Sequence, residues 1–301
     1  MLMEDNRMKS KIVKTLFAIL MASGLIVQFT SCSKSEEEVT TTKTPEQEVA
    51  GLQKIDEITQ GNYTFYIFKK DTGNLVVGYN EVYIQLKNNS TGKYVQDANL
   101  VWQPRMHMDA MSHACPYSAI SKVDNTKTLY KGYFIFIMAS DNMDYWEIKY
   151  SYINGQDTLA QVADQPKVVQ STGLLRYRSF KGSDNAYYYL ALVNPTSSQV
   201  GTNDITAYLY KYIDLYTFNP VANYTVLIDP RMPDMGNHTS PNNVNLTYDS
   251  STNLYKGKVN LTMTGYWKVN LIVKDASGTV LKGDSITSTT TSSSIYFELE
   301  F

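Results

Sequence analysis

The chain has 301 residues, with 27 lysines and arginines against 29 aspartates and glutamates, which gives a formal net charge of −2. This balance, without a run of basic residues, lacks the electrostatic footprint of a nucleic-acid-binding protein, so we expect no nucleic-acid partner. Residues 54–301 are enough for one large domain or two ordinary ones.

The first 32 residues have the pattern of a lipoprotein signal peptide. Residues 8–14 contain three lysines, residues 15–27 are largely apolar, and small polar residues lead into Cys32. A basic region, an apolar run of roughly 7–15 residues and small residues before a cleavage point are typical of a removed export signal. The run is shorter than the roughly 20 residues needed to cross a bilayer. The lipobox-like end therefore predicts lipidation at Cys32.

Residues 33–53 are predicted to form a flexible tether, because they are rich in threonine and glutamate and have little to bury. Their first part, residues 33–38, resembles the acidic export tags of surface lipoproteins in Bacteroidota, although an ordinary solvated linker has the same composition. We expect an outer-membrane lipoprotein that is held to the membrane by its N-terminal lipid and faces the periplasm or the cell surface.

The rest of the chain contains an internal repeat. The tripeptide Pro-Arg-Met at 104–106 recurs at 230–232, and Leu-Tyr-Lys-Gly at 129–132 recurs at 254–257. In each copy a histidine lies three residues before a proline, and a tryptophan follows in a later segment. Self-similarity of this kind predicts two copies of one domain.

Each copy consists of short alternating runs bounded by turn signals. Residues 63–68 and 82–86 are examples of such runs, and Asn-Ser-Thr-Gly at 89–92 marks a turn. No stretch after the signal peptide has a 3.6-residue period over ten or more positions. The pattern favours an all-β protein with two tandem immunoglobulin-like β-sandwich domains, at residues 54–170 and 171–301.

All three histidines lie in two corresponding segments of the repeat, together with five of the eight methionines that follow Cys32. Thioether sulfur and imidazole suit Cu(I), and methionine replaces thiolates that an oxidising compartment would disable. Copper, as Cu(I), is therefore the predicted cofactor. It would be sequestered, or received from a metal-donor protein or passed to a metal-acceptor protein. The candidate ligands are Met106, His107, Met108, Met111 and His113 in the first copy and Met232, Met235 and His238 in the second.

The geometry of a β-strand limits which candidate ligands of the first copy can bind the same ion. If residues 106–108 are extended, both methionines face one way and His107 faces the other, so all three converge only in a loop. Met138 and Met263 are expected to be core residues, and Cys115 a buried small hydrophobe, with ligation left open for each.

The second copy resembles the YtkA-like and FixH-like domains. The resemblance rests on a Met-x-x-His loop after a proline, on the Leu-Tyr-Lys-Gly strand at 254–257 and on Gly-Tyr-Trp-Lys-Val at 265–269. It covers about residues 188–273 and the first copy more loosely. It implies small β-sandwich domains of the cell envelope, some of which are associated with copper handling and cytochrome oxidase assembly.

The sequence has none of the catalytic motifs His-Glu-x-x-His, Gly-x-Ser-x-Gly or a phosphate loop. We therefore expect a non-enzymatic protein. The main alternative is an adhesion or assembly β-sandwich that presents tyrosine-rich strands to a protein or glycan partner. The methionine clusters would then be contact surfaces. A zinc or haem carrier is less favoured, because one or two histidines per copy fall short of a structural zinc site.

Overall fold

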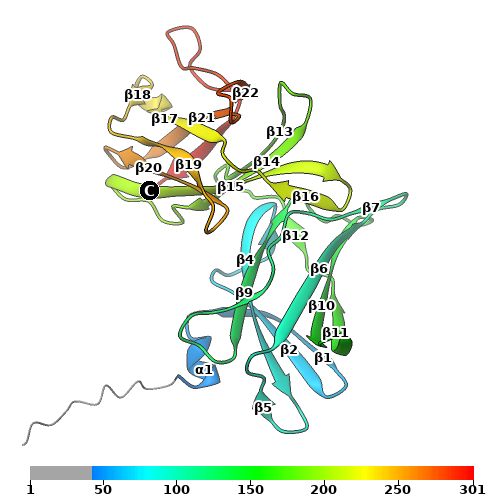
Figure 1. Ribbon diagram of the computed structural model, residues 1–301. Coiled ribbons are helices and arrows are strands. Elements are labelled where there is room, and N and C mark those ends of the chain that lie inside the picture. The colour runs from blue at the N-terminus through cyan, green and yellow to red at the C-terminus, as the bar shows by residue number, and fades with distance from the viewer. Residues whose placement is uncertain (1–42) are drawn as a thin grey trace, which may run out of the picture. The chain divides into compact units, whose positions relative to one another are not determined.

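The computed structural model describes residues 43–301 (Figure 1). The expected signal peptide, the lipidated Cys32 and the acidic segment at 33–38 lie outside these residues. Between residues 43 and 301, no helix has the length and apolarity needed to cross a membrane. Strands account for nearly all of the regular structure in this part of the chain, which confirms the all-β class.

A short helix, α1 (Pro45–Glu48), opens the described part of the chain. The Glu48 side chain is 7% exposed, and its carboxylate accepts hydrogen bonds from the backbone N–H groups of Lys127 and Thr128 at 2.5 and 2.9 Å and from the Thr128 hydroxyl at 2.6 Å. The last part of the expected tether, residues 44–53, is thus attached to the folded unit through Glu48. The sequence did not reveal this docking because the partners of Glu48 lie about 80 residues away.

The first half of the described chain is a sandwich of two antiparallel sheets. Its core lies between them and contains Trp102, Phe134 and Trp146. One sheet has the order β1 (Gln53–Gln60), β2 (Tyr63–Lys69), β4 (Gly78–Asn88), β9 (Leu129–Phe136) and β8 (Ser121–Lys122), with β5 (Lys93–Tyr94) beside β4. The other has the order β11 (Asp157–Asp164), β10 (Tyr145–Asn154), β6 (Asn99–His107) and β7 (Ser112–His113). A separate short pair joins β12 (Val168–Val169) in parallel to β3 (Leu75–Val76).

The second half is one continuous sheet that folds over itself around a second core. The layers are joined because β19 pairs with both β20 and β17, which gives a barrel-like sandwich. The strand order is β13 (Tyr177–Lys181), β14 (Tyr187–Asn194), β15 (Gly201–Asp214), β20 (Leu254–Leu261), β19 (Val244–Asp249), β17 (Thr225–Met232), β21 (Tyr266–Lys274) and β22 (Val280–Gly283). Three further strands pair beside this path: β16 (Thr217–Pro220) with β15, β18 (His238–Thr239) with β17 and β23 (Tyr296–Glu300) with β21. A short 3-10 helix, η1 (Pro233–Met235), precedes β18.

Equivalent contacts recur in the two halves of the described chain. In the first half, Asn80 donates from Nδ2 to the carbonyl groups two and four residues earlier, at 2.8 and 2.7 Å. In the second half, Asn203 makes the same two bonds at 3.0 and 2.7 Å. The register agrees as well, since Pro104 opposes Ile148 in the pairing of β6 with β10 and Pro230 opposes Val269 in that of β17 with β21.

Tyrosines from both halves pack against one another within the compact unit that spans residues 42–301. The Tyr133 ring stacks on Tyr208 with centroids 4.4 Å apart, and its hydroxyl is 2.7 Å from that of Tyr210. Burial raises the pKa of Tyr210 to about 12. These tyrosines contribute to the interior and are not presented to an external partner.

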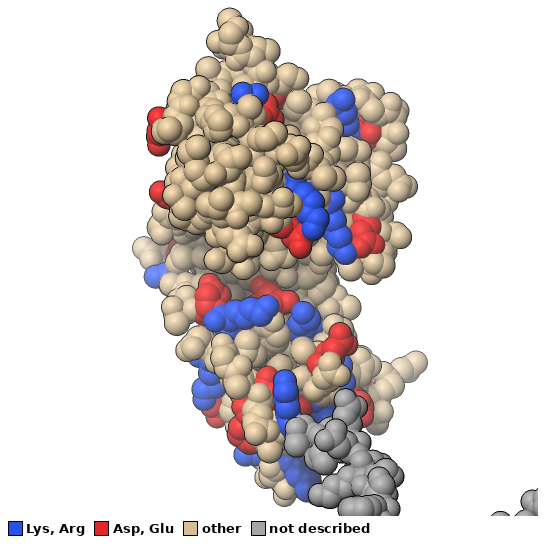
Figure 2. Space-filling view, turned by 90° about the vertical axis from the view of Figure 1, so that its left-hand side faces the viewer, with Lys and Arg blue, Asp and Glu red and all other residues tan. Residues whose placement is uncertain are grey.

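Charges on the surface are mixed in sign. On the face drawn in Figure 2, lysine and arginine side chains lie beside aspartates and glutamates. The ion pairs Lys122–Asp97 at 2.7 Å and Lys211–Asp184 at 3.2 Å are of this kind. Exposed pairs of this type contribute little to stability, typically about 0–1 kcal/mol each.

Candidate functional site

The β6–β7 hairpin places two of the predicted ligands on the inner face of the first sandwich. Met106 and His113 oppose each other across the hairpin, and His107 opposes Ser112. Directly opposed residues in an antiparallel pair have side chains on the same side of the sheet. Met106 is fully buried and His113 is 8% exposed, so both side chains point into the core.

The His113 ring is held in one orientation by its own strand. Its Nδ1 atom lies 2.7 Å from the carbonyl oxygen of Ala114, and a carbonyl can only accept, so Nδ1 donates a hydrogen. In the neutral ring the lone pair is then on Nε2, which lies 3.1 Å from Sδ of Met138. An imidazole nitrogen and a thioether sulfur thus converge at one partly buried point.

Trp146 forms a wall of this cluster and fixes the methionine that completes it. Its indole Nε1 donates to the carbonyl oxygen of Met138 at 2.9 Å, and its ring stands edge-on to His113 with centroids 5.5 Å apart. Trp146 is fully buried and opposes Met106 in the pairing of β6 with β10. We refer to Met106, His113, Met138 and Trp146 as the inner Met–His cluster.

The remaining candidates of the first half lie away from that point. His107 is on the outer face, where its ring stacks on Tyr145 at 5.0 Å and its Nε2 is 3.8 Å from a Glu147 carboxylate oxygen. Met108 is half-buried against the same core as Met106, whereas Met111 at the hairpin turn is 47% exposed. Strand geometry predicts that Met106 and His107 face opposite sides of the sheet, as they do here. The structure brings together Met106 and His113 but not His107 or Met111.

Cys115 follows β7 and is fully buried in the core of the first half. Burial raises the pKa of its thiol well above the usual range. Metal ligation requires the thiolate, which this environment disfavours. Its position is that of a small apolar core residue.

A turn of the second half contacts β7. The backbone N–H of Ala114 donates to the carbonyl of Leu215 at 2.8 Å, and the hydroxyls of Ser112 and Tyr216 are 2.9 Å apart. The Tyr216 ring also lies over the guanidinium of Arg105, 4.0 Å from its centroid. These contacts help to hold the strand that carries His113.

The second half has methionines and a tryptophan in corresponding positions, but its histidine is exposed. Met232 is 4% exposed and opposes His238 across β17 and β18, and Trp267 donates from Nε1 to the carbonyl oxygen of Met263 at 3.0 Å. His238 is exposed, and Met235 in η1 is 58% exposed. Two methionines therefore occupy the inner positions here, while the imidazole is at the surface.

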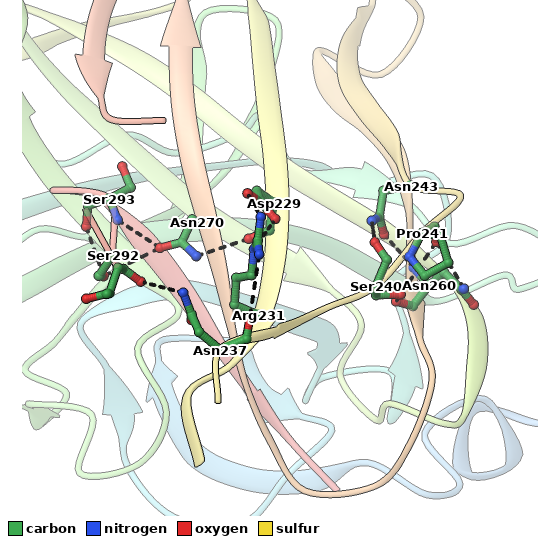
Figure 3. Close-up of polar contacts among 11 residues, drawn as sticks. Asp229, Arg231, Asn237, Ser240, Pro241, Asn243, Asn260, Asn270, Ser292 and Ser293 are labelled. Carbon is green, nitrogen blue, oxygen red and sulfur yellow. Dashed lines mark hydrogen bonds and ion pairs between the residues drawn. The ribbon is translucent and has the colours of Figure 1, made fainter. Parts of the chain in front are cut away.

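Polar contacts hold the loop that carries Met235 and His238 (Figure 3). Arg231 forms a bidentate ion pair with Asp229 at 2.7 and 2.9 Å and donates from Nη1 to the Asn237 carbonyl oxygen at 3.4 Å. Asn237 in turn donates to the carbonyl of Thr291 at 3.3 Å. Asn270, beside them in Figure 3, donates to the Asp229 carbonyl at 3.1 Å. The exposed donors thus stand on an anchored loop.

The chemistry of the clusters rests on sulfur and imidazole. Within residues 43–301, no group of three or more histidine, cysteine, aspartate or glutamate side chains is placed to hold a metal ion. From the sequence, Met138 is expected to be a core residue with ligation left open, and in the structure it packs against the core with its sulfur beside His113. Met138 and Met263 each lie six residues after the glycine of the repeated Leu-Tyr-Lys-Gly.

Comparison with known proteins gives a match to a domain family and matches to solved structures. No curated protein matches the chain. A solved DUF4785 family protein from Legionella pneumophila is 11% identical, with a TM-score of 0.24, and the match covers 73% of this chain and 54% of that one. The chain thus spans about half the length of that structure. Residues 184–271 match the YtkA-like family, which confirms the resemblance for most of the second half.

Proposed function

We propose that this protein is a non-enzymatic lipoprotein of the cell envelope that binds Cu(I) through methionine and histidine side chains, for sequestration or transfer. The observation that carries the proposal is the approach of His113 Nε2 to Met138 Sδ at 3.1 Å. Both are neutral donors of the type that Cu(I) favours. The YtkA-like match of residues 184–271, a family of envelope β-sandwich domains, supports the cellular setting.

In the first half, His113 and Met138 would be the central ligands, with Met106 as a third donor from the opposing strand. Met106 is fully buried and packs in the same core cluster as Met138. Met108 is partly buried against the same core. His107 and Met111 would take no part at this point, since one is on the outer face and the other is in the exposed turn.

In the second half, Met232 and Met263 would form the inner part of a second site, and the exposed His238 and Met235 its outer part. The register that opposes Met232 to His238 supports this assignment, as does the tryptophan bond to Met263. We propose that this site is the more accessible of the two. A metal-donor or metal-acceptor protein would meet the anchored loop of η1 and β18.

The test is a Cu(I) titration of the chain that begins after Cys32, against a chromophoric chelator that competes for the metal. Met138→Leu keeps the side-chain volume but removes the sulfur, so we expect the affinity to fall at least about tenfold, or about 1.4 kcal/mol. Met143→Leu is the matched control, because Met143 is 78% exposed in a surface loop.

Failure of the unsubstituted chain to retain copper would overturn the proposal. Equal losses of affinity in Met138→Leu and Met143→Leu would exclude the inner Met–His cluster as the site. The adhesion alternative would then be the next to test, by binding of protein and glycan partners.

A further inference from the structure

A cleft of about 690 Å³ is lined by two stretches of the chain, residues 69–81 and residues 170–196. Its volume is within the range of small-molecule sites, about 300–1,000 Å³. Aliphatic side chains form much of the lining, among them Leu75, Val77 and Leu192. Leu75 and Leu192 are 3% and 2% exposed and belong to the core behind the cleft, whereas Val77, Leu174 and Leu175 are partly exposed and offer apolar surface to it.

Three cationic side chains line the cleft, and two of them are neutralised within the protein. Lys69 lies 3.4 Å from an Asp71 carboxylate oxygen, and Lys70 lies 2.8 Å from one of Glu81. The third is Arg176, which makes no ion pair with any carboxylate in residues 43–301.

The Arg176 guanidinium has donors to spare. It donates from Nη2 to the carbonyl oxygen of Val193 at 3.2 Å, and a guanidinium has five N–H groups. Burial lowers the pKa of Arg176, the sign of a charge that has lost part of its hydration. A half-buried cation without a counter-charge is costly unless an anion compensates for the lost water.

We propose that this cleft binds a small organic acid, with its carboxylate on Arg176 and its apolar body against Val77, Leu174 and Leu175. The planar guanidinium matches a carboxylate in bidentate geometry, which a lysine ammonium does not. The aliphatic walls favour an acid with a hydrocarbon chain over a highly charged one. This site is separate from the methionine and histidine clusters and does not depend on copper binding.

The probe is hexanoate, titrated into the chain beginning after Cys32, which retains the whole compact unit of residues 42–301. Calorimetry measures binding, and the methyl resonances of Val77, Leu174 and Leu175 locate it. The comparison probes are 1-hexanol, which has the apolar body without the charge, acetate, which has the charge without the body, and inorganic phosphate.

Arg176→Gln is the test variant and Arg178→Gln is its matched control. Arg178 lies two residues along the same segment, but its guanidinium stacks on Tyr296 at 4.6 Å and does not line the cleft. We expect saturable binding of hexanoate with shifts at the three methyl sites, at least about tenfold weaker binding of hexanol, and a loss of about tenfold or more in Arg176→Gln alone.

Several results would overturn the proposal. They are the absence of saturable hexanoate binding to the unsubstituted chain, equal binding of hexanol, an equal loss in Arg178→Gln, or binding of phosphate alone. If Arg176→Gln fails to fold by circular dichroism, the hexanoate and hexanol titrations and the methyl shifts of the unsubstituted chain decide the question by themselves.

Discussion

The Nε2 atom of His113 lies 3.1 Å from the Sδ atom of Met138, while Nδ1 of the same ring donates to the carbonyl oxygen of Ala114. In the neutral ring, this arrangement directs a nitrogen lone pair at a sulfur that also has lone pairs. A cation between the two atoms, or a proton on Nε2, makes the approach favourable. The proposed copper function corresponds to a bound cation. A bound cation and a proton on Nε2 lead to different predictions for metal affinity.

Replacing His113 by alanine should lower the Cu(I) affinity at least about tenfold, whereas His107→Ala should change it less than about twofold. The reason is position, since His113 is inside the cluster and His107 stacks on Tyr145 on the outer face. Chelator competition measures both, with thermal unfolding as a check on folding. A loss in His107→Ala that equals the loss in His113→Ala would contradict the assigned ligand set.

Gly132→Ala should destabilise the first half by about 1–3 kcal/mol or more, the range for overpacking. A Cβ at this position would lie 2.5 Å from the Trp102 ring and 2.9 Å from the Ala119 carbonyl oxygen. Trp102 is fixed by the bond from its Nε1 to the Ser118 carbonyl at 2.6 Å, so it cannot move freely. Urea unfolding gives the free-energy change.

Gly173→Ala is the control for that substitution, because its Cβ would meet no atom within 4 Å. We expect its free energy of unfolding to stay within about 0.5 kcal/mol of the unsubstituted value. A similar loss in both variants would contradict a clash with Trp102 as the cause, because restricting the unfolded chain by itself stabilises the fold.

Glu48→Ala should detach the segment around α1 and lower the free energy of unfolding by about 1.5–3 kcal/mol, the range for hydrogen bonds to a charged group. The carboxylate accepts two bonds from Thr128 and one from Lys127. Limited proteolysis should then cut within residues 44–53. Glu46→Ala, on the exposed face of the same helix, should resist cleavage as the unsubstituted chain does.

Asp164→Asn should remove a dependence of stability on pH. Burial, together with a hydrogen bond shared with Asp56, raises the pKa of Asp164 to about 7. Between about pH 4 and 7 the folded chain therefore holds more protons here than the unfolded chain does, so stability falls as pH rises through this window. The neutral amide should flatten this decline and raise the melting temperature at pH 8.

The matched control for this variant is Asp157→Asn, at the exposed start of the same strand, β11. Its melting temperature should fall between pH 4 and 7 as that of the unsubstituted chain does. If Asp164→Asn still shows the full decline, the Asp56–Asp164 pair is not its cause.

Two parts of the site could be predicted from the sequence, and one could not. Met106 and His113 could be identified because both belong to a clustered motif, and strand alternation separated His107 from its neighbours. Met138 could not be placed, because its contact with His113 depends on how the segment after β9 meets β7 across the sandwich. Likewise, the unequal burial of His113 and His238 is invisible in a repeat that treats them alike.

The sequence by itself determined the all-β class, the period-two alternation along the strands and the repeated positions of methionine, histidine and tryptophan, because these are properties of neighbouring residues. Only the tertiary structure decided that Glu48 docks on Thr128, that Met138 joins His113 and that Arg176 lines a cleft without a carboxylate partner among the described residues. The contact of Glu48 with Thr128 joins residues 80 positions apart, and that of His113 with Met138 joins residues 25 positions apart. These contacts depend on sheet order and strand register, which are set by the packing of the whole core and not by any local pattern.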